Sequence, residues 1–492
     1  MIRMEEYKER FIEFLLKTGA LKVFENPNDD RTLKSKRISP WFVNIGDFND
    51  GEYSGALAGF YADAIINSGV KTDILYGIPD KGVGLVTSTA VAMAQKGQNA
   101  GWFFSRKDEK KHGEATNLPP TERIKALTVG MAPKEGQSIV QLDDVFTAGD
   151  AKYEANKFLK SLGNFNLSLL AIGVDRQEVA TDSREAIAEY QQKTGTYVVS
   201  VVTATDVYNY LKENKKISEG ALKRLENYLR VYGTASVGNQ FDKLEQRIIE
   251  RDRSVIPACD VSTIEELEKI VQATINVEGI GGYKIGFELA LNYGLPKVVD
   301  VIRKNKTRPV AIIYDHQKAG TDIPDTGKNF ARVCKNAGVD AVILFPQAGP
   351  ETERAWIYHA LDNGLKVIVG GRMTHPAYVV SEGGFVTDSG ALDMYRIAAR
   401  AGINNFVVPG NKIDIIKQVR EIVEAEGIIP IFYAPGFVAQ GGKIDAAAKV
   451  AGDRFHGIVG RGIYQAEDIH DAAIEYTSQL ESPAISIKMR LK

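Results

Sequence analysis

Eight short apolar runs recur between residues 255 and 461, and nearly all of them are separated by a segment of helical length. The runs are VIPACDV (255–261), GGYKIGF (281–287), PVAIIYD (309–315), VDAVILF (339–345), LKVIVGG (365–371), INNFVVP (403–409), IIPIFYAP (428–435) and HGIVGR (456–461). Eight strand–helix repeats in about 240 residues predict a (β/α)8 barrel, in which chemistry lies at the C-terminal ends of the strands. Several chemically informative residues fall at or just beyond those ends: Asp260, Lys284, Asp315, Thr374, Gly436 and Arg461.

The first half of the chain also alternates apolar runs with helical stretches. The runs are ILYGIP (74–79), SIVQLDDV (138–145), LSLLAIGVD (167–175) and TYVVSVVT (196–203). Strands separated by helix-length segments predict a parallel, doubly wound sheet over residues 1–212. Residues 213–250 are rich in charge and in helix formers, so they predict a helical linker that leaves residues 251–492 for the barrel.

A length of 492 residues exceeds one ordinary hydrophobic core, which agrees with two large domains. The net charge of −2 gives no reason to expect nucleic acid or a membrane surface as the main partner. The sequence contains no run of about 18 apolar residues that would span a bilayer. The N-terminal stretch MIRMEEYKERFIEFLLKTG predicts an amphipathic helix rather than a signal peptide.

The two cysteines, Cys259 and Cys334, lie in widely separated contexts. They exclude a disulfide framework and predict a reducing, cytoplasmic location. Their expected role is that of small buried core residues.

The segment SIVQLDDVFTAGDA (138–151) carries the sharpest signal of the first half. A buried strand leads into Asp143 and Asp144, then into a turn and a helix. Backbone N–H groups of such a turn, backed by a helix N-terminus, suit a phosphate monoester. The paired acids suit ribose hydroxyls and a hydrated Mg²⁺. Taken alone, the segment is also compatible with an ordinary strand-to-helix turn that has acidic caps.

This segment resembles the phosphoribosyl-pyrophosphate (PRPP) motif of type I phosphoribosyltransferases. Four further segments narrow the resemblance to orotate phosphoribosyltransferase across residues 1–212: LKSKRISPWFVN (33–44), GIPDKG (77–82), FSRKDEKKHGE (104–114) and VDRQE (174–178). The resemblance implies that Lys107 is catalytic and that Mg²⁺ is a cofactor, bound mainly through PRPP and water near the paired acids. The residues it implies for binding PRPP or orotate are Lys34, Trp41, Phe42, Lys81, Arg106, Lys110, His112, Asp143, Asp144, Thr147, Ala148, Gly149 and Arg176.

The charged segment 104–114 also has a chemical rationale as a closing loop. Pyrophosphate leaves as a highly charged anion while the ribose carbon becomes cation-like, and a loop with several cations stabilises that separation of charge and excludes water. Two positions depart from the family pattern. Lys36 stands where glycine is usual, which predicts a different backbone shape. Asp150 lies inside the phosphate turn, so its side chain is expected to point away from the ligand.

The strand ends of the predicted barrel carry alternating acids and lysines, which are costly to bury unless paired and therefore indicate a functional site. Gly-rich turns, APGFVAQGG (434–442) and VGRGIY (459–464), follow strands seven and eight, which is the usual phosphate site of a barrel. Together with RMTHP (372–376), these segments resemble orotidine 5'-monophosphate decarboxylase over about residues 251–485.

This second resemblance implies decarboxylation without a cofactor, with Asp260, Lys284, Asp315, Lys318 and Asp322 as catalytic residues. Lys318 protonates the C6 carbanion, because a fixed ammonium beside that carbon stabilises the transition state more than the ground state. Asp322 reaches the neighbouring subunit's site, which implies a homodimer. The remaining residues implied for substrate binding are Thr326, Thr374, Gln440, Gly441, Gly460 and Arg461.

One spacing departs from the decarboxylase pattern. The family reads Asp-x-Lys-x-x-Asp, whereas this chain reads DHQKAGTD (315–322). An acid and a lysine three positions apart on a strand face opposite sides unless a bulge or turn intervenes. The strand is therefore expected to end at Asp315, and His316 is interpreted as a spacer in the following turn.

Together the resemblances imply an α/β chain in which a type I phosphoribosyltransferase sheet is fused to a (β/α)8 TIM barrel, the arrangement of bifunctional UMP synthases. Orotate and PRPP would give orotidine 5'-monophosphate and pyrophosphate, and then UMP and CO₂. One alternative retains the transferase but gives the barrel inactive or altered sugar-phosphate chemistry, typically with Mg²⁺. Another is a regulatory module that senses PRPP, against which the charged loop and the lack of a basic recognition helix both argue.

Overall fold

The computed structural model describes residues 4–46, 48, 50–106, 120–146, 149–238, 240–241, 246–437 and 443–480, without the side chains at positions 120, 121, 123, 317 and 318. The chain divides into two compact units, Met1–Leu229 and Arg230–Lys492. The division falls within helix α9 (Glu219–Tyr232), inside the segment interpreted as a linker. The limits 1–212 and 251–492 stay predictions.

The first unit is built on a six-stranded sheet with the strand order β10-β9-β8-β5-β6-β7. The strands are β5 (Ile74–Gly77), β6 (Gly101–Ser105), β7 (Thr128–Gly130), β8 (Ser138–Leu142), β9 (Asn166–Asp175) and β10 (Tyr197–Thr203). All neighbouring pairs are parallel except β6 and β7, so the predicted parallel sheet carries an antiparallel edge strand.

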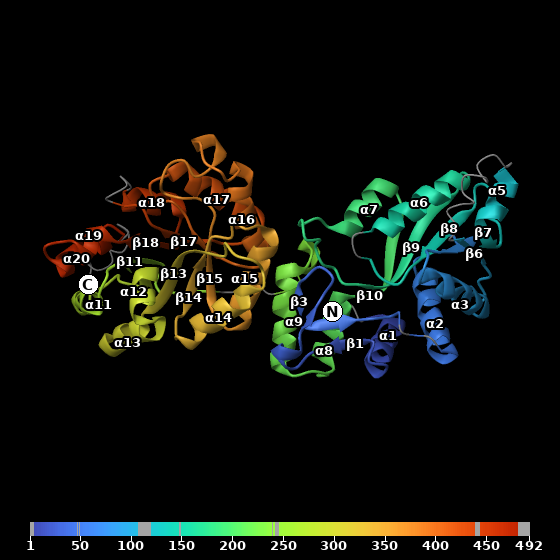
Figure 1. The fold of residues 1–492 in the computed structure, drawn as a ribbon, viewed down its shortest axis with the longest axis horizontal. Helices are drawn as coiled ribbons and strands as arrows, with labels where there is room; N and C mark the ends of the chain where they lie inside the picture. Colours follow the sequence, from blue (N-terminus) through green and yellow to red (C-terminus); the bar gives the residue numbers. More distant parts are fainter. Residues whose placement is uncertain are drawn as a thin grey trace, which may run out of the picture. The chain divides into compact units, whose positions relative to one another are not determined.

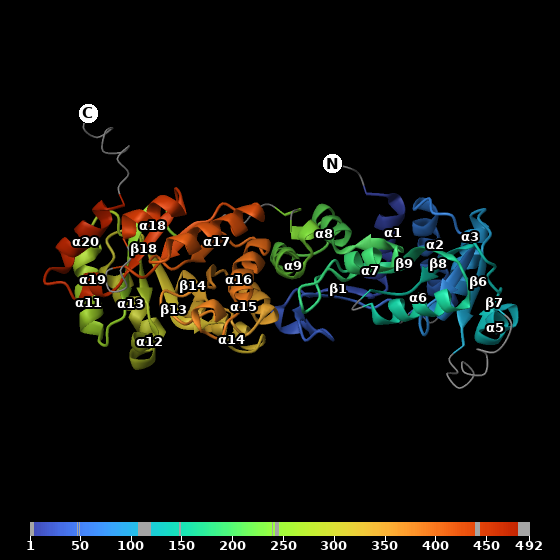
Figure 2. The same ribbon diagram turned by 90° about the horizontal axis from the view of Figure 1, so that it is seen from above.

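Helices cover both faces of this sheet, as the doubly wound prediction requires. Figures 1 and 2 show α2 (Gly51–Asn67) and α3 (Gly82–Gln95) on the opposite side of the sheet from α6 (Asp150–Leu162). Apolar side chains of α6 and α7 (Ala186–Thr194) pack with alternate residues of the strands, among them Tyr76 of β5. The alternation along each strand therefore places apolar side chains on both faces.

Smaller elements complete the first unit. They are α1 (Glu6–Lys17), β1 (Leu21–Val23), a 3₁₀ turn (Pro27–Asp29), β2 (Arg31–Thr32), β3 (Ile38–Ser39), β4 (Trp41–Val43), α5 (Pro120–Leu127) and α8 (Ala204–Glu213). The predicted N-terminal amphipathic helix is confirmed as α1, which buries Phe11, Ile12 and Leu15.

Much of the predicted linker belongs to the first unit. Helix α9 buries Leu225 and Tyr228, and Arg224 donates to the carbonyl of Phe24 at 2.9 Å. The hydroxyl of Ser218 donates to the Glu25 carboxylate. The start of α9 is therefore fastened to the N-terminal elements by buried apolar side chains and by polar contacts.

The second unit is the predicted barrel, closed by eight parallel strands in chain order. The strands are β11 (Arg253–Cys259), β12 (Gly282–Ile285), β13 (Ala311–Ala319), β14 (Ala341–Leu344), β15 (Lys366–Gly370), β16 (Asn405–Val407), β17 (Ile431–Ala434) and β18 (Phe455–Val459). Each of the eight apolar runs contains or overlaps one of these strands.

Helices surround the barrel strands, as Figures 1 and 2 show. They are α11 (Ile264–Thr274), α12 (Phe287–Tyr293), α13 (Leu295–Asn305), α14 (Thr326–Asn336), α15 (Pro350–Asp362), α16 (Asp388–Arg400), α17 (Ile413–Ala425), α18 (Ile444–Ala451), α19 (Arg461–Tyr464) and α20 (Ile469–Ser478). Two short elements, α10 (Ala235–Gly238) and a 3₁₀ turn (Val380–Glu382), complete the unit.

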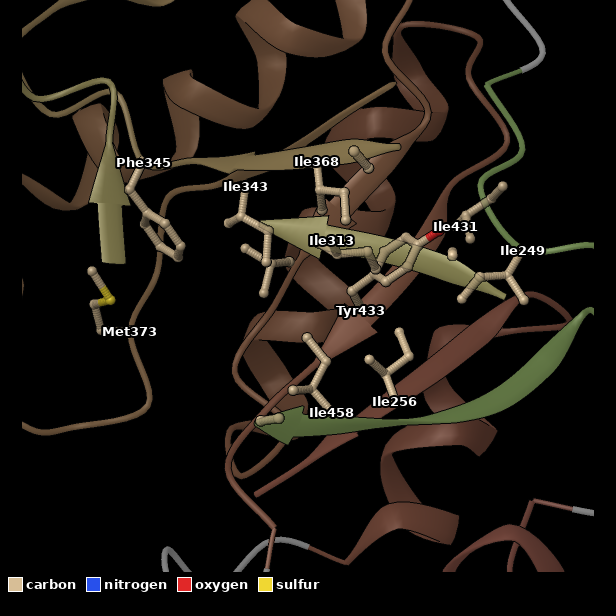
Figure 3. Packing of buried hydrophobic residues seen from close by; sticks show 14 of the residues in the cluster. Ile249, Ile256, Ile313, Ile343, Phe345, Ile368, Met373, Ile431, Tyr433 and Ile458 are labelled. Atoms are coloured by element: carbon tan, nitrogen blue, oxygen red, sulfur yellow. The ribbon is translucent and has the colours of Figure 1, made fainter. Parts of the chain in front are cut away.

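The inside of the barrel is filled by the side chains shown in Figure 3. Ile249, from the segment that precedes β11, packs against this core. Nearby, the backbone carbonyl of Gln246 accepts from Asn405 Nδ2 at 2.8 Å, and its side-chain carbonyl accepts from the backbone N–H of Val367 at 3.3 Å. The last residues of the predicted linker are thus part of the barrel's own core and hydrogen bonding.

Both cysteines are buried and free, as predicted for core residues. Burial, with a smaller contribution from the charge of Asp260, raises the pKa of Cys259 to about 12, so its thiol stays protonated at neutral pH. Within the described ranges, none of the helices combines the length and the apolar character needed to cross a membrane.

Candidate active sites

The first site lies where the strand order of the sheet reverses. From β5 the chain continues to β6 on one side and then to β8 on the other, so the C-terminal ends of β5 and β8 form a topological switch point, where ligands bind in doubly wound folds. Gly77 and Gly82 allow the turn after β5 to approach β8 closely, because a Cβ at Gly82 would lie 2.5 Å from the Leu142 carbonyl oxygen. The turns after the two strands are therefore adjacent.

Two lysine–carboxylate pairs occupy this switch point. Lys81 Nζ lies 2.6 Å from Asp144 Oδ2, and Lys152 Nζ lies 2.5 Å from Asp143 Oδ2. The Lys81 side chain is 55% exposed, whereas those of Asp143 and Lys152 are each 8% exposed. Burial raises the pKa of Asp143 although Lys152 opposes that shift. Asp144 is therefore paired with a cation that can leave it for a ligand, and Asp143 is not.

The described end of the turn between β8 and α6 is a helix N-terminus, which suits an anion. Gly149 has a φ of 89° and caps α6, whose backbone N–H groups at Lys152 and Tyr153 donate to the Gly149 carbonyl. Asp150 is exposed at the first position of the helix. The predicted members Thr147 and Ala148 lie outside the described residues.

Arg176, predicted to bind orotate, lies in a buried cluster of charged and aromatic side chains. Its guanidinium carbon lies 4.1 Å from the centre of the Trp41 ring, and its Nη2 lies 2.6 Å from Glu178 Oε1. Glu178 also pairs with Arg37 at 3.6 Å. The Tyr228 hydroxyl of α9 interacts with Arg176 as well. The structure therefore brings Arg176 and Trp41 together and adds three residues that the sequence did not indicate.

The other residues predicted for the first site lie outside this charged and aromatic cluster. Phe42 packs under Arg31, whose guanidinium carbon lies 4.1 Å from the ring centre, while Lys34 and Arg106 are exposed. The loop members Lys107, Lys110 and His112 lie outside the described residues.

Lys36, which replaces the usual glycine, adopts the left-handed backbone conformation that glycine favours, with a φ of 69°. It lies in the turn between β2 and β3, where its N–H donates to the Leu33 carbonyl at 2.9 Å. The expected change in backbone shape is thus not seen at this residue, because lysine takes up the strained conformation itself.

Replacing Lys36 with glycine is expected to raise the free energy of unfolding of the first unit by about 0.5–1 kcal/mol. The left-handed conformation costs a residue with a Cβ about 1–2 kcal/mol, and the greater freedom of glycine in the unfolded chain offsets part of that gain. Chemical denaturation measures the change. Ser35→Gly in the same turn, where φ is not positive, is the control and should not stabilise; equal gains from both variants would contradict the explanation.

The second site is centred on Lys284, which points from β12 toward two acids. Its Nζ lies 3.1 Å from Asp260 Oδ1, just after β11, and 3.2 Å from Asp315 Oδ2 on β13. The lysine side chain is 7% exposed. Burial lowers its pKa, but the charges of Asp315 and Asp260 outweigh burial and raise the pKa above its usual value. Lys284 is therefore a permanently charged group between two carboxylates.

Lys284 and Asp315 of this network form part of the wall of an open cavity. The cavity lies at the C-terminal ends of the strands and is lined by Lys284, Asp315, Phe345, Arg372 and Thr374, among others. Phe345 and Ile343 also belong to the barrel core in Figure 3, so the core continues into the cavity. The cavity therefore combines an apolar wall with charged groups on one side, as in sites for small ligands.

Thr374, predicted to bind substrate, is held by a contact from the segment after β16. Its carbonyl accepts from Asn411 Nδ2 at 3.0 Å. Arg372 is buried and pairs with Glu382 at 3.3 Å and with Asp388 at 3.4 Å. Arg372 was not among the predicted site residues, although its position just beyond a barrel strand could have indicated it.

The unusual spacing between Asp315 and Asp322 is accommodated inside the strand. Contrary to the expectation that the strand ends at Asp315, β13 extends to Ala319. The register shifts within it, since Tyr314 pairs with Val342 and Ala319 pairs with Leu344. Five positions on β13 therefore span two on β14, which is a bulge, the other route by which the acid and the lysine could share a face.

His316 is more than the spacer that the sequence suggested. Its Nδ1 lies 2.5 Å from the Tyr314 hydroxyl, and its ring packs edge-on against Phe330 of α14. Phe330 in turn packs against Trp356 of α15, whose Nε1 donates to the Ile323 carbonyl at 3.2 Å. Aromatic contacts thus connect the bulge with the residue after Asp322.

Replacing His316 with alanine is expected to lower the turnover of the barrel's reaction about tenfold, because the bulge that presents Asp315 loses its brace and small misplacements are costly in catalysis. Binding of the product UMP should change little, since the predicted phosphate and pyrimidine contacts lie on other loops. Steady-state kinetics and UMP titration measure both. His470→Ala, exposed at the start of α20, is the control. An unchanged turnover, or turnover and UMP affinity falling together, would contradict the role.

The remaining predicted barrel residues are placed as follows. Asp322 is exposed, and its backbone carbonyl accepts from the Thr352 hydroxyl at 3.0 Å. Thr326 begins α14 and does not line the cavity. Gly460 caps the short helix α19, which begins with the exposed Arg461. Gln440 and Gly441, together with the Lys318 side chain, lie outside the described part of the structure.

Carboxylates suit a hydrated Mg²⁺ at the first site, where Asp144, paired with the exposed Lys81, is the acid that could face it. Across the described residues, the cluster of possible metal ligands that stands out is Asp468, His470 and Asp471, all exposed. Exposed acidic groups of this kind are ordinary at a helix start, so the cluster is not interpreted as a metal centre.

Two α/β units, each with charged side chains gathered at the C-terminal ends of its parallel strands, define the chain as a two-domain enzyme. Residues 253–476 match the family model described as "Orotidine 5'-phosphate decarboxylase / HUMPS family". The orotate phosphoribosyltransferase of Ruthia magnifica subsp. Calyptogena magnifica is 35% identical over 231 residues, which cover 47% of this chain and 100% of that relative. That of Klebsiella pneumoniae subsp. pneumoniae is 36% identical over 231 residues, with the same coverage.

Similar solved structures include that of orotate phosphoribosyltransferase of Francisella tularensis. It is 33% identical over 46% of this chain and 100% of that one, with a TM-score of 0.39. Orotidine 5'-monophosphate decarboxylase of Methanocaldococcus jannaschii is 24% identical over 47% of this chain and 99% of that one, with a TM-score of 0.40. The chain belongs to the orotate phosphoribosyltransferase family in its N-terminal half and carries an orotidine 5'-phosphate decarboxylase domain in its C-terminal half. It is therefore an enzyme with both activities, which are successive steps of de novo pyrimidine synthesis.

Proposed function

We propose that the first unit joins orotate to PRPP at the ends of β5 and β8, and that the Lys284 network of the barrel decarboxylates the product to UMP. The observation that carries the second assignment is the buried lysine held between Asp260 and Asp315 beside the cavity. The assignment of the first unit rests on the two lysine–carboxylate pairs at the switch point of its sheet. The relatives of this unit are orotate phosphoribosyltransferases.

In the first reaction, orotate lies beside Arg176 and Trp41, while the turn that ends at Gly149 accepts the 5'-phosphate of PRPP. Asp144 would hold a hydrated Mg²⁺, which would supply positive charge to offset that of the pyrophosphate. Lys81 then exchanges Asp144 for the pyrophosphate oxygens, an exchange that its exposure permits. Arg106 and the loop residues Lys107, Lys110 and His112 close over the leaving group, which stabilises its charge and excludes water.

In the second reaction, the charged network surrounds the carboxylate that is lost. Asp315 lies beside that carboxylate, and Lys284, paired with Asp260, holds Asp315 at a fixed position in the cavity wall. Lys318 protonates the carbanion at C6. Arg461, Gly460, Gln440 and Gly441 hold the phosphate, and this remote contact supplies the energy that positions the reacting carbon.

A chelator test separates the two reactions and the alternatives. Orotate, PRPP and Mg²⁺ are expected to give UMP, and EDTA should abolish that conversion because the first step needs the metal. UMP formation from added orotidylate should be unchanged by EDTA, because the barrel uses fixed protein charges. Orotidylate that accumulates without UMP would contradict the barrel assignment and favour altered sugar-phosphate chemistry. Binding of PRPP without any transfer would favour a regulatory module.

Assembly and location are part of the same proposal. We infer a homodimer in which the exposed Asp322 completes the partner's decarboxylase site, and monomers alone in sedimentation at assay concentration would contradict it. A cytoplasmic location is supported by the two free cysteines. Fractionation that finds the chain in an oxidising compartment would contradict it.

A further inference from the structure

The buried ion pair between Asp143 and Lys152 differs from the other pair at the switch point. Asp143 Oδ2 lies 2.5 Å from Lys152 Nζ, and Asp143 Oδ1 accepts from the backbone N–H of Asp144 at 2.8 Å. Both carboxylate oxygens therefore have partners within the protein. Since the two side chains are each only 8% exposed, Asp143 points into the unit rather than toward a ligand.

The backbone at Asp143 is fixed from a second direction. The buried hydroxyl of Tyr61, on α2, donates to the Asp143 carbonyl at 2.9 Å. Lys152 also lies over the ring of Phe146, with its Nζ 5.8 Å from the ring centre. The pair thus joins the end of β8 to the first turn of α6, and these two elements bracket the turn that ends at Gly149.

An ordinary surface ion pair would not have this effect. Lys193 and Glu189 of α7 pair as well, but the lysine is 59% exposed and water can replace either partner. Removing one partner of a desolvated pair leaves a buried charge without compensation. The surrounding structure must then move to bring that charge to water or to a new partner. The segment that would move is the one that carries Asp144 and the phosphate turn.

We propose that Lys152 is a positioning residue for phosphoribosyl transfer, which holds Asp143 inward so that Asp144 faces the ligand. This inference rests on the proposed assignment of the phosphate turn to PRPP. It assigns the two predicted acids different roles: Asp144 contacts the ligand or its hydrated metal, and Asp143 supports the site from behind. Side chains that support a site in this way are often nearly as important as those that touch the ligand.

The test compares Lys152→Met with Lys152→Arg in the full chain, with Lys157→Met, exposed on the same helix, as the matched control. Lys152→Met is expected to raise the KM for PRPP about tenfold or more and to change the KM for orotate by less than about twofold. Lys152→Arg, which keeps the charge, should recover most of the loss. Decarboxylation of added orotidylate by the same preparation should be unchanged and reports the amount of folded barrel, while circular dichroism reports whether the first unit is folded.

A double variant, Lys152→Met with Asp143→Asn, keeps the proposal testable if the single variant loses its fold. With neither charge left in the interior, the double variant should fold and transfer within about tenfold of the unaltered enzyme, because Asp143 does not touch the ligand. A folded double variant without transfer would overturn the proposal, since Asp143 would then act on the ligand directly. An unchanged KM for PRPP in folded Lys152→Met would also overturn it. If the unaltered chain and Lys157→Met both fail to transfer, the proposed function itself is wrong.

Discussion

Replacing Lys284 with methionine is expected to lower decarboxylation of orotidylate by about a thousandfold or more, while phosphoribosyl transfer by the same chain is unchanged. Methionine has a similar volume but no charge, so the carboxylates of Asp260 and Asp315, now 3.1 and 3.2 Å from Lys284 Nζ, would repel each other and the substrate carboxylate. The measurement is the time course from orotate and PRPP, in which orotidylate should accumulate in place of UMP.

The same substitution should destabilise the barrel, because removal of one partner from a buried ion pair typically costs about 3–5 kcal/mol. Circular dichroism and UMP binding show whether the variant remains folded. Lys269→Met, exposed on α11, is the matched control and should leave both activities unchanged. A folded Lys284→Met variant that still makes UMP at more than about a tenth of the normal rate would contradict the role given to the network.

The barrel could be predicted from sequence because each strand is buried and therefore reads as a short apolar run. The six-stranded sheet was predicted less completely. β6 has the sequence GWFFS and runs directly into the charged loop, and β7 has three residues at the sheet edge. Strands this short are stabilised by their pairing with a neighbour rather than by local preference, so their sequences carry a weak signal.

Site residues could be predicted where they belong to a sequence motif. They could not be predicted where only the tertiary structure brings them to the site. Asp260, Lys284 and Asp315 were predicted, and they meet in space. Lys152 was not, because a lysine on a helix usually faces water, and nothing in DAKYEANKF shows that this one faces Asp143. The bulge in β13 was one of two alternatives. The three-residue spacing between Asp315 and Lys318 requires a bulge or a turn, but it does not distinguish between them.

The largest effect expected in the first unit comes from Glu178, which compensates the buried guanidinium group of Arg37 and the largely covered one of Arg176. Its carboxylate pairs with Arg176 at 2.6 Å and with Arg37 at 3.6 Å, and Arg37 also donates to the Val179 carbonyl at 2.7 Å. Glu178→Gln keeps the shape of the side chain but removes the charge that both arginines need. The free energy of unfolding of the first unit is therefore expected to fall by about 3–5 kcal/mol.

Catalysis should be affected more selectively than stability. With Glu178 neutral, Arg176 loses the partner that holds it over the Trp41 ring, so the KM for orotate should rise about a hundredfold while the KM for PRPP changes by less than about threefold. Glu189→Gln, which removes a partly exposed carboxylate that pairs with the exposed Lys193 and Arg184, is the matched control and should cost under about 1 kcal/mol. Equal rises in both KM values would instead indicate general loosening of the unit, and Arg176 would then have no specific part in orotate binding.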